Sequence, residues 1–134
     1  MNRSVEIICV GNELLNGYTL NANAHWMANE IANVGGVVRR VTVVRDEIDE
    51  IDAPIKESLR RKPKWVIISG GLGPTYDDKT LQGLAKALGR KLIVSKEAAR
   101  MLRRKYVKTP TLYLLLRAIR WQPYQWVQSH WKIL

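Results

Sequence analysis

The chain has 134 residues, of which 46% are hydrophobic and 25% are charged, and its formal net charge is +10. These values fit one globular domain and exclude a disordered or fibrous protein, and the length is too short for two ordinary domains. No apolar run reaches the roughly 18 residues that a membrane span needs, and a single cysteine, Cys9, excludes a disulfide framework. We therefore expect a cytoplasmic protein that makes no membrane contact.

The first part of the chain alternates between short apolar runs and an amphipathic segment. Residues 5–10 form an apolar run that predicts a buried strand. Residues 23–34 place their apolar side chains on one face of a helix, for which Asn21 or Asn23 can serve as the N-cap. The β-branched run at 37–44 predicts a second strand.

The same alternation continues along the chain. Apolar residues four apart predict a helix over 49–61, and the apolar run 65–69 predicts a third strand. An apolar stripe predicts a helix over 80–88, followed by a short fourth strand at 91–94 and a basic helix at 96–107. Because parallel strands need helical crossovers, this order predicts a three-layer α/β/α fold with a mostly parallel sheet.

The C-terminal part of the chain differs from the rest. Residues 1–97 hold 14 Lys and Arg against 12 Asp and Glu, a net charge of +2, whereas residues 98–134 hold 8 Lys and Arg and no acid, a net charge of +8. The basic excess therefore says little about the partner of the main body, for which we do not expect nucleic acid. We assign residues 1–109 to the α/β domain and interpret 110–134 as an atypical basic and aromatic tail. That tail is either foreign to the domain, as after a shifted reading frame, or an amphipathic membrane or nucleic-acid contact.

The loop after the third predicted strand is the strongest candidate for a site. In an open α/β sheet, ligands bind at the carboxyl ends of the strands, and glycines there let backbone amides approach an anion. Asp78 is placed to begin the next helix and cap its free N–H groups, so a tight strand-to-helix turn without a ligand is the competing interpretation. The candidate ligand-binding residues of this loop are Ser69, Gly70, Gly71, Leu72, Gly73, Pro74, Thr75 and Asp77.

Two further loops follow predicted strands and carry polar groups. Gly11, Asn12 and Glu13 come after the first strand, and the Glu13 carboxylate can accept hydrogen bonds or hold magnesium. Asp46 comes after the second strand and is a candidate for facing a metal or a ligand. In the alternative interpretation, Glu13 is a solvated acid and Asp46 caps the helix that begins near Asp49.

These loops together resemble those of a known family. The string GGLGPTYDDKT after the strand WVIIS closely resembles the signature loop of the molybdopterin-binding domains of the MogA, MoaB and CinA N-terminal group. VGNELLNGYTLNAN resembles the opening loop of that family and VVRDE its middle acidic loop. The presence of Leu72, and of Asp77 before Asp78, is more similar to the CinA type than to the MogA type.

The resemblance implies a function and a set of site residues. It implies that the loop glycines line an anion-binding turn and that Asp46 and Asp78, with Glu13 from the opening loop, position Mg²⁺ or the ligand. It implies a phosphorylated pterin (molybdopterin) or a nucleotide as ligand and a role in molybdenum cofactor biosynthesis by nucleotidyl transfer. For the CinA type it implies cleavage of the ADP-ribose pyrophosphate instead, and a non-catalytic binding module is the third possibility. Relatives of this type form trimers, hexamers or dimers, which implies a homo-oligomer.

The sequence departs from the family pattern at two points. Asn12 stands where relatives usually have an acid, which removes one charge that could bind a metal. Relatives also continue with a further strand and a loop rich in proline and glycine that completes the site, and nothing similar follows Thr109. The resemblance therefore implies a domain that can bind a ligand, with catalysis left open.

Overall fold

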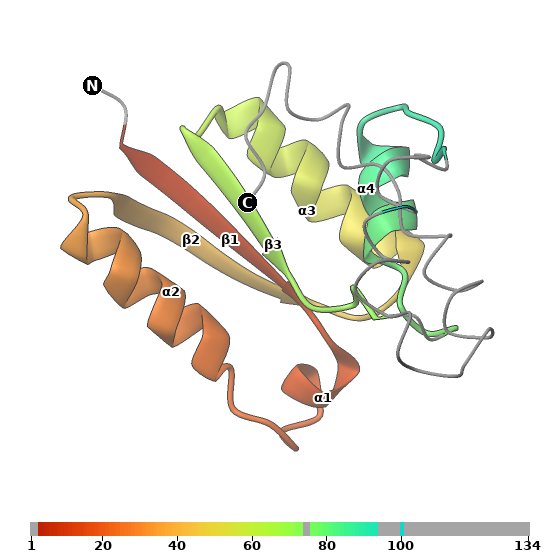
Figure 1. Ribbon diagram of the computed structural model, residues 1–134, viewed down its shortest axis with the longest axis horizontal. Helices are drawn as coiled ribbons and strands as arrows, with labels where there is room; N and C mark the ends of the chain where they lie inside the picture. The colour runs from red at the N-terminus through yellow and green to blue at the C-terminus, as the bar shows by residue number, and fades with distance from the viewer. Residues whose placement is uncertain (1–2, 74–75, 94–99, 101–134) are drawn as a thin grey trace.

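Three parallel strands form a sheet in the part of the chain that the structure describes. The computed structural model describes residues 3–73, 76–93 and 100 (Figure 1). The strands are β1 (Ser4–Val10), β2 (Val37–Val44) and β3 (Trp65–Ser69), in the order β2-β1-β3. Both neighbours run parallel to β1, so each is reached by a crossover through a helix.

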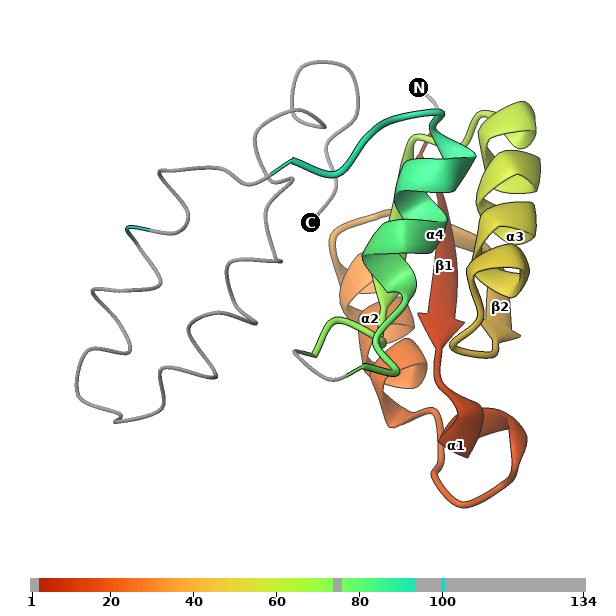
Figure 2. The same ribbon diagram turned by 90° about the vertical axis from the view of Figure 1, so that its right-hand side faces the viewer.

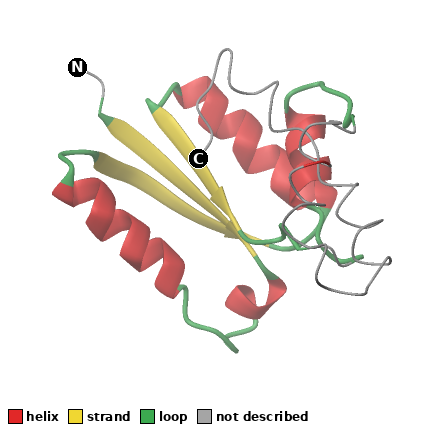
Figure 3. Cartoon of the chain, in the orientation of Figure 1, coloured by secondary structure: helices red, strands yellow, loops and turns green. Residues whose placement is uncertain are grey.

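Helices cover both faces of this sheet. Helix α2 (Ala22–Asn33) lies on one face, and α3 (Ile48–Arg61) and α4 (Thr80–Ala87) lie on the other (Figures 1 and 2). A short helix, α1 (Asn12–Leu15), follows the end of β1 (Figure 3). The predicted three-layer α/β/α fold with a parallel sheet is confirmed.

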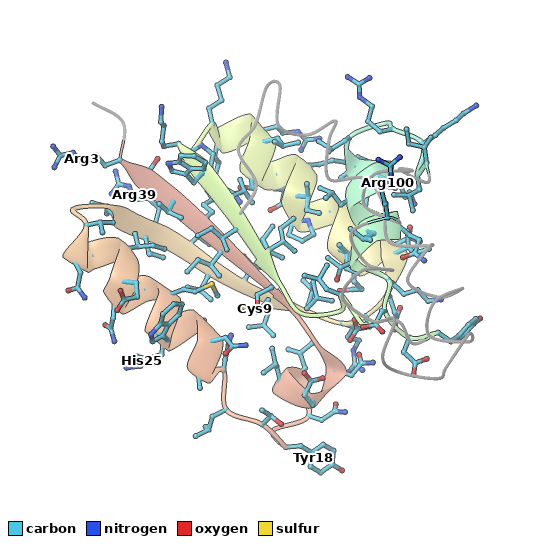
Figure 4. The ribbon with its side chains drawn as sticks, in the orientation of Figure 1. Arg3, Cys9, Tyr18, His25, Arg39 and Arg100 are labelled. Atoms are coloured by element: carbon cyan, nitrogen blue, oxygen red, sulfur yellow. The ribbon has the colours of Figure 1, made fainter. Side chains whose placement is uncertain are left out.

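The central strand β1 supplies the core of both layers. Its residues from Val5 to Val10 are all buried, and alternate side chains point to opposite faces. Ile7 and Cys9 pack with Ala24 of α2, while Ile8 and Val10 pack with α3. Cys9 is thus a buried core residue, as Figure 4 shows, and burial raises the pKa of its thiol.

The two helices on the other face pack closely on each other. A Cβ added at Gly83 of α4 would lie 2.5 Å from Cγ2 of Ile51 in α3, so only glycine allows this approach. Lys86 of α4 also donates a hydrogen bond to Asp49 of α3. This contact fixes the position of α4, and therefore of the loop that leads into it.

Most of the predicted elements agree with the structure. All three long predicted helices within the described part appear with ends shifted by at most one residue. Asn21 is the N-cap of α2, where its Oδ1 accepts from the Ala24 N–H at 3.2 Å. Helix α1 falls in a segment that we interpreted as a loop.

The predicted fourth strand is not found in the part of it that the structure describes. Residues 91–93 form no strand, and Leu92 and Ile93 are exposed rather than paired in the sheet. The predicted helix at 96–107 and the tail at 110–134 lie outside the described residues, apart from Arg100. In the part of the chain that the structure describes, no helix is long and apolar enough to cross a membrane.

One buried charge in the core has a matched partner. Glu6, only 4% exposed, accepts two hydrogen bonds from the Arg61 guanidinium, both at 2.7 Å. The Arg61 hydrogen bond holds the pKa of Glu6 below its usual value, against the opposing effect of burial. Such a charge-assisted pair compensates for removing the carboxylate from water.

We expect Glu6→Gln to lower the free energy of unfolding by about 2 kcal/mol at pH 7, because an amide cannot replace two charge-assisted bonds. The pKa of Glu6 is lowered in the folded state, so its stabilising effect is complete above the unfolded pKa of about 4.3 and is lost as pH falls through the folded pKa. Urea unfolding from pH 7 to pH 2 measures this. Glu57→Gln is the control, because Glu57 approaches the same arginine but is exposed. Equal effects of the two variants, or a pH-independent difference, would contradict the assignment.

Candidate functional site

The three candidate loops meet at the carboxyl ends of the strands. The Gly11 N–H after β1 donates to the Val44 carbonyl of β2 at 3.0 Å, and the Asp46 N–H donates to Oδ1 of Asn12 at 3.4 Å. Figure 1 shows α1 and the loop after β3 at this same end of the sheet. The structure thus brings together the opening, middle and glycine loops, which lie far apart in the sequence.

The glycine turn after β3 approaches the backbone of β1 and the middle loop. Gly70 has φ 91° and Gly71 has φ 56°, backbone angles that residues with a Cβ atom rarely adopt. A Cβ added at Gly70 would lie 1.9 Å from the Val10 carbonyl oxygen. A Cβ added at Gly71 would lie 2.5 Å from Oδ1 of Asp46. Both glycines are therefore required by the close approach of other groups.

Asp46 is the residue in this group with an unusual environment. Its Oδ1 is buried and has no hydrogen-bond partner among the described residues. Burial raises the pKa of Asp46, and the negative charges of Glu13, Asp78 and Asp77 raise it further, against a hydrogen bond from the Asn12 backbone. Helix α3 has Glu47 as its N-cap residue and no side-chain cap, so the interpretation of Asp46 as a helix cap is wrong. An unpaired buried oxygen beside several other acids is an environment that a cation would stabilise.

Asp78 holds the glycine loop rather than capping the next helix. Its Oδ1 accepts the Gly73 N–H at 2.7 Å. Helix α4 begins at Thr80 with Lys79 as its N-cap residue and without a side-chain cap. The predicted cap is therefore wrong, because the carboxylate turns back to the nearest loop amide. That amide is already paired, so the anion-binding groups of the turn are to be sought at Gly70 and Gly71.

Thr80 contacts the glycine turn of the candidate site, although the predicted site residues did not include it. Its hydroxyl donates to the Gly70 carbonyl at 2.8 Å, its N–H donates to the Gly71 carbonyl at 3.3 Å, and the residue is 1% exposed. It therefore fixes the carbonyls of both glycines and the orientation of the turn. A threonine at a helix start is too common for the sequence alone to reveal this role.

The remaining predicted residues are placed less closely. The Glu13 carboxylate lies over Gly11, within 2.9 Å of where a Cβ at Gly11 would stand, and Glu13 is exposed on α1. Ser69 ends β3, Leu72 is 37% exposed, and Asp77 is exposed. Pro74 and Thr75 lie outside the described residues. His25 is exposed on α2 (Figure 4), where its ring bonds to the Asn29 amide at 3.2 Å.

The acidic residues fit a magnesium site that a ligand completes. No three His, Cys, Asp or Glu side chains in the described ranges gather closely enough to hold a metal by themselves. Magnesium is usually held by one or two carboxylates together with waters and substrate phosphates, so a full protein cage is not required. The unpaired oxygen of Asp46 is the ligand that fits best, with Asp78 and Glu13 as neighbouring charges.

A family model and related chains agree with this architecture. The model described as a probable molybdopterin binding domain matches residues 6–125. A protein of Metallosphaera sedula is 52% identical over 103 residues, which are 77% of this chain and 39% of the relative. A protein of Sulfolobus acidocaldarius is 52% identical over 107 residues, 80% of this chain and 40% of the relative. The chain thus spans about two fifths of the length of these curated relatives.

Solved structures give the same result. The crystal structure of the protein CinA from Thermoplasma acidophilum, described as having unknown function, superposes with a TM-score of 0.77 at 38% identity and covers 86% of this chain and 68% of its own. A molybdopterin biosynthesis protein from Mycobacterium abscessus has a TM-score of 0.62 at 19% identity, covering 81% of this chain and 66% of its own, which shows a shared fold. With the family model matching most of its length, this chain belongs to the molybdopterin-binding domain family, as its glycine loop predicts.

Proposed function

We propose that the domain binds a phosphate-bearing ligand, a phosphorylated pterin or a nucleotide, together with Mg²⁺ at the carboxyl edge of the sheet. The observation that carries the proposal is the position of Asp46, whose buried, unpaired Oδ1 lies beside the backbone of Gly71. A backbone that only glycine permits and a carboxylate oxygen that has no partner among the described residues thus meet at one point. This pairing favours an anion and a cation bound next to each other.

Electrostatics supports a metal at this point. The negative charges of Glu13, Asp77 and Asp78 act on Asp46. These acids would repel a phosphate that bound here without a cation. Bound Mg²⁺ would neutralise the phosphate oxygens and draw charge from the phosphorus centre. Asp46 would hold the cation, with Asp78 and Glu13 nearby, while the Gly70–Gly71 turn would orient the phosphate through backbone amides.

The positioning groups of the protein would keep this arrangement rigid. Thr80 fixes the Gly70 and Gly71 carbonyls, and Asp78 fixes the Gly73 amide, so the turn is held from both sides. A site that is arranged before the ligand arrives loses little energy on reorganisation. No side chain needs to act as a nucleophile if the chain only aligns phosphate groups and metal.

Catalysis by such a site would be a transfer or hydrolysis at phosphorus. One form of the reaction is nucleotidyl transfer to molybdopterin, and the alternative, which the resemblance of the glycine loop to the CinA type implies, is cleavage of the pyrophosphate of ADP-ribose. A binding module without turnover is the third form of the proposal. A cytoplasmic location and a homo-oligomer complete the proposal as predictions from the sequence.

Calorimetry with and without Mg²⁺, followed by a turnover assay, tests the proposal. The ligands are AMP, ADP-ribose and molybdopterin, and turnover is followed with ADP-ribose alone or with molybdopterin plus ATP. Binding that needs Mg²⁺ supports the proposal, and release of AMP or formation of an adenylylated pterin decides between the enzyme forms. Absence of binding for all three ligands would refute it.

We expect Asp78→Asn to lower any turnover at least about tenfold, because it removes a negative charge next to the metal position. The Asn oxygen can still accept the Gly73 N–H, so the loop and the unfolding midpoint should change little. Single-turnover rates and thermal unfolding measure the two effects. Glu50→Gln, an exposed acid on α3, is the control that should leave turnover unchanged. Full turnover in Asp78→Asn would remove Asp78 from the mechanism.

A further inference from the structure

A lysine and a tyrosine stand together at the rim of the glycine turn. The Nζ atom of Lys79 lies 4.0 Å from the centroid of the Tyr76 ring. Tyr76 is 73% exposed, so the ammonium leaves most of this residue accessible. Neither residue contributes to the core clusters of the domain.

The backbone of Lys79 is fixed directly beside the turn. Its neighbour Asp78 binds the Gly73 amide, and its other neighbour Thr80 binds the Gly70 carbonyl. Lys79 therefore stands between the two residues that hold the glycine loop. A ligand seated on Gly70 and Gly71 would come close to the start of α4, where this lysine is the N-cap residue.

Among the described residues, the ammonium of Lys79 forms no salt bridge with an acid. Lys56, Arg61 and Lys86 pair with carboxylates, whereas the ammonium of Lys79 faces an aromatic ring. The attraction of an exposed ring for an ammonium is weaker than a charge-assisted hydrogen bond to phosphate. A phosphate oxygen can therefore draw Lys79 from the ring at little cost.

From this geometry we propose that Tyr76 and Lys79 form a recognition pair for the ligand of the proposed function. Lys79 contacts a phosphate oxygen of the ligand, and the exposed part of the Tyr76 ring stacks on its planar base or pterin. The inference rests on the proposed function and adds to it two specificity residues. It limits the ligand to molecules that join a flat heterocycle to a phosphate group.

Three probes separate the two contacts: AMP carries both groups, adenosine lacks the phosphate, and ribose 5-phosphate lacks the base. Each is measured by calorimetry or by competition against AMP, in the presence of Mg²⁺. We expect Lys79→Met to weaken AMP and ribose 5-phosphate about tenfold and adenosine less than twofold. We expect Tyr76→Leu to weaken AMP and adenosine about tenfold and ribose 5-phosphate less than twofold, whereas Tyr76→Phe keeps the affinity of wild type.

The controls distinguish failure of this inference from failure of the proposed function. Lys64→Met, an exposed lysine before β3 at the opposite end of the sheet, should change none of the affinities. Circular dichroism verifies that each variant is folded. If wild-type protein binds none of the probes, both the inference and the nucleotide form of the proposed function are refuted. If the wild-type protein binds AMP but adenosine does not compete for the site, only the recognition pair is refuted. The same conclusion follows if both variants bind every probe with wild-type affinity, or if both lose affinity for all three probes equally.

Discussion

Gly70→Ala should destabilise the domain strongly, and we expect it to lower the free energy of unfolding by at least about 3 kcal/mol. The new Cβ would lie 1.9 Å from the Val10 carbonyl oxygen, a backbone atom of the central strand that cannot move aside. The φ of 91° adds strain of its own. Both effects oppose the same substitution, so the loss exceeds that of an ordinary glycine replacement. Urea unfolding followed by circular dichroism measures it.

Gly17→Ala is the matched control for this effect. Gly17 also has a positive φ, 75°, but a Cβ there would meet nothing within 4 Å. We therefore expect a loss of about 1 kcal/mol, from backbone strain alone. The difference between the two variants isolates the contact with β1. If Gly70→Ala costs no more than Gly17→Ala, the turn does not press on the Val10 carbonyl and the described site geometry is wrong.

Asp46→Asn should abolish the Mg²⁺ dependence of ligand binding while leaving the fold intact. We expect affinity for AMP in the presence of Mg²⁺ to fall about 100-fold, because the amide retains the shape of the carboxylate but not its charge or its strength as a metal ligand. Calorimetry with and without Mg²⁺ measures the change. Unaltered Mg²⁺-dependent binding in this variant would show that the buried oxygen of Asp46 does not face the cation.

The same variant should be more stable than wild type at neutral pH. Burial raises the pKa of Asp46, so the folded state takes up a proton more readily than the unfolded state. Stability attributable to this residue therefore rises as pH falls through the folded pKa towards the unfolded value of about 3.9. Asp46→Asn lacks this dependence, and its advantage over wild type should shrink on acidification. Thermal unfolding between pH 8 and pH 4 tests this, with Glu50→Gln as the control for removal of an exposed acid.

The periodicity of the sequence was sufficient to predict the layers of the fold. The apolar run 5–10 became the buried central strand, and the stripe in 49–61 became α3, because burial of apolar side chains decides both. The strand order β2-β1-β3 was not predicted, since periodicity shows which face is buried but not which strand is the neighbour. The short helix α1 was missed, as four residues give no periodic signal.

The site was predicted in its location but not in its internal contacts. The glycines and acids lie at the carboxyl edge because every parallel strand ends there. The sequence does not reveal the hydrogen bond from the Gly73 amide to Asp78 or the contact of the Lys79 ammonium with the Tyr76 ring. Both contacts depend on the local path of the chain. A carboxylate at a helix start can bind either helix amides or loop amides, and the sequence does not distinguish these outcomes. The unpaired oxygen of Asp46 is likewise a property of packing.

A crystal structure of the protein with AMP and Mn²⁺ in place of Mg²⁺ is the most direct test. The anomalous signal of manganese locates the metal independently of the ligand. The proposed site predicts metal within bonding distance of Oδ1 of Asp46 and a phosphate oxygen on the backbone of Gly70 and Gly71. Metal and phosphate bound elsewhere, with the Asp46 oxygen facing protein atoms and the turn filled by its own side chains, would contradict it.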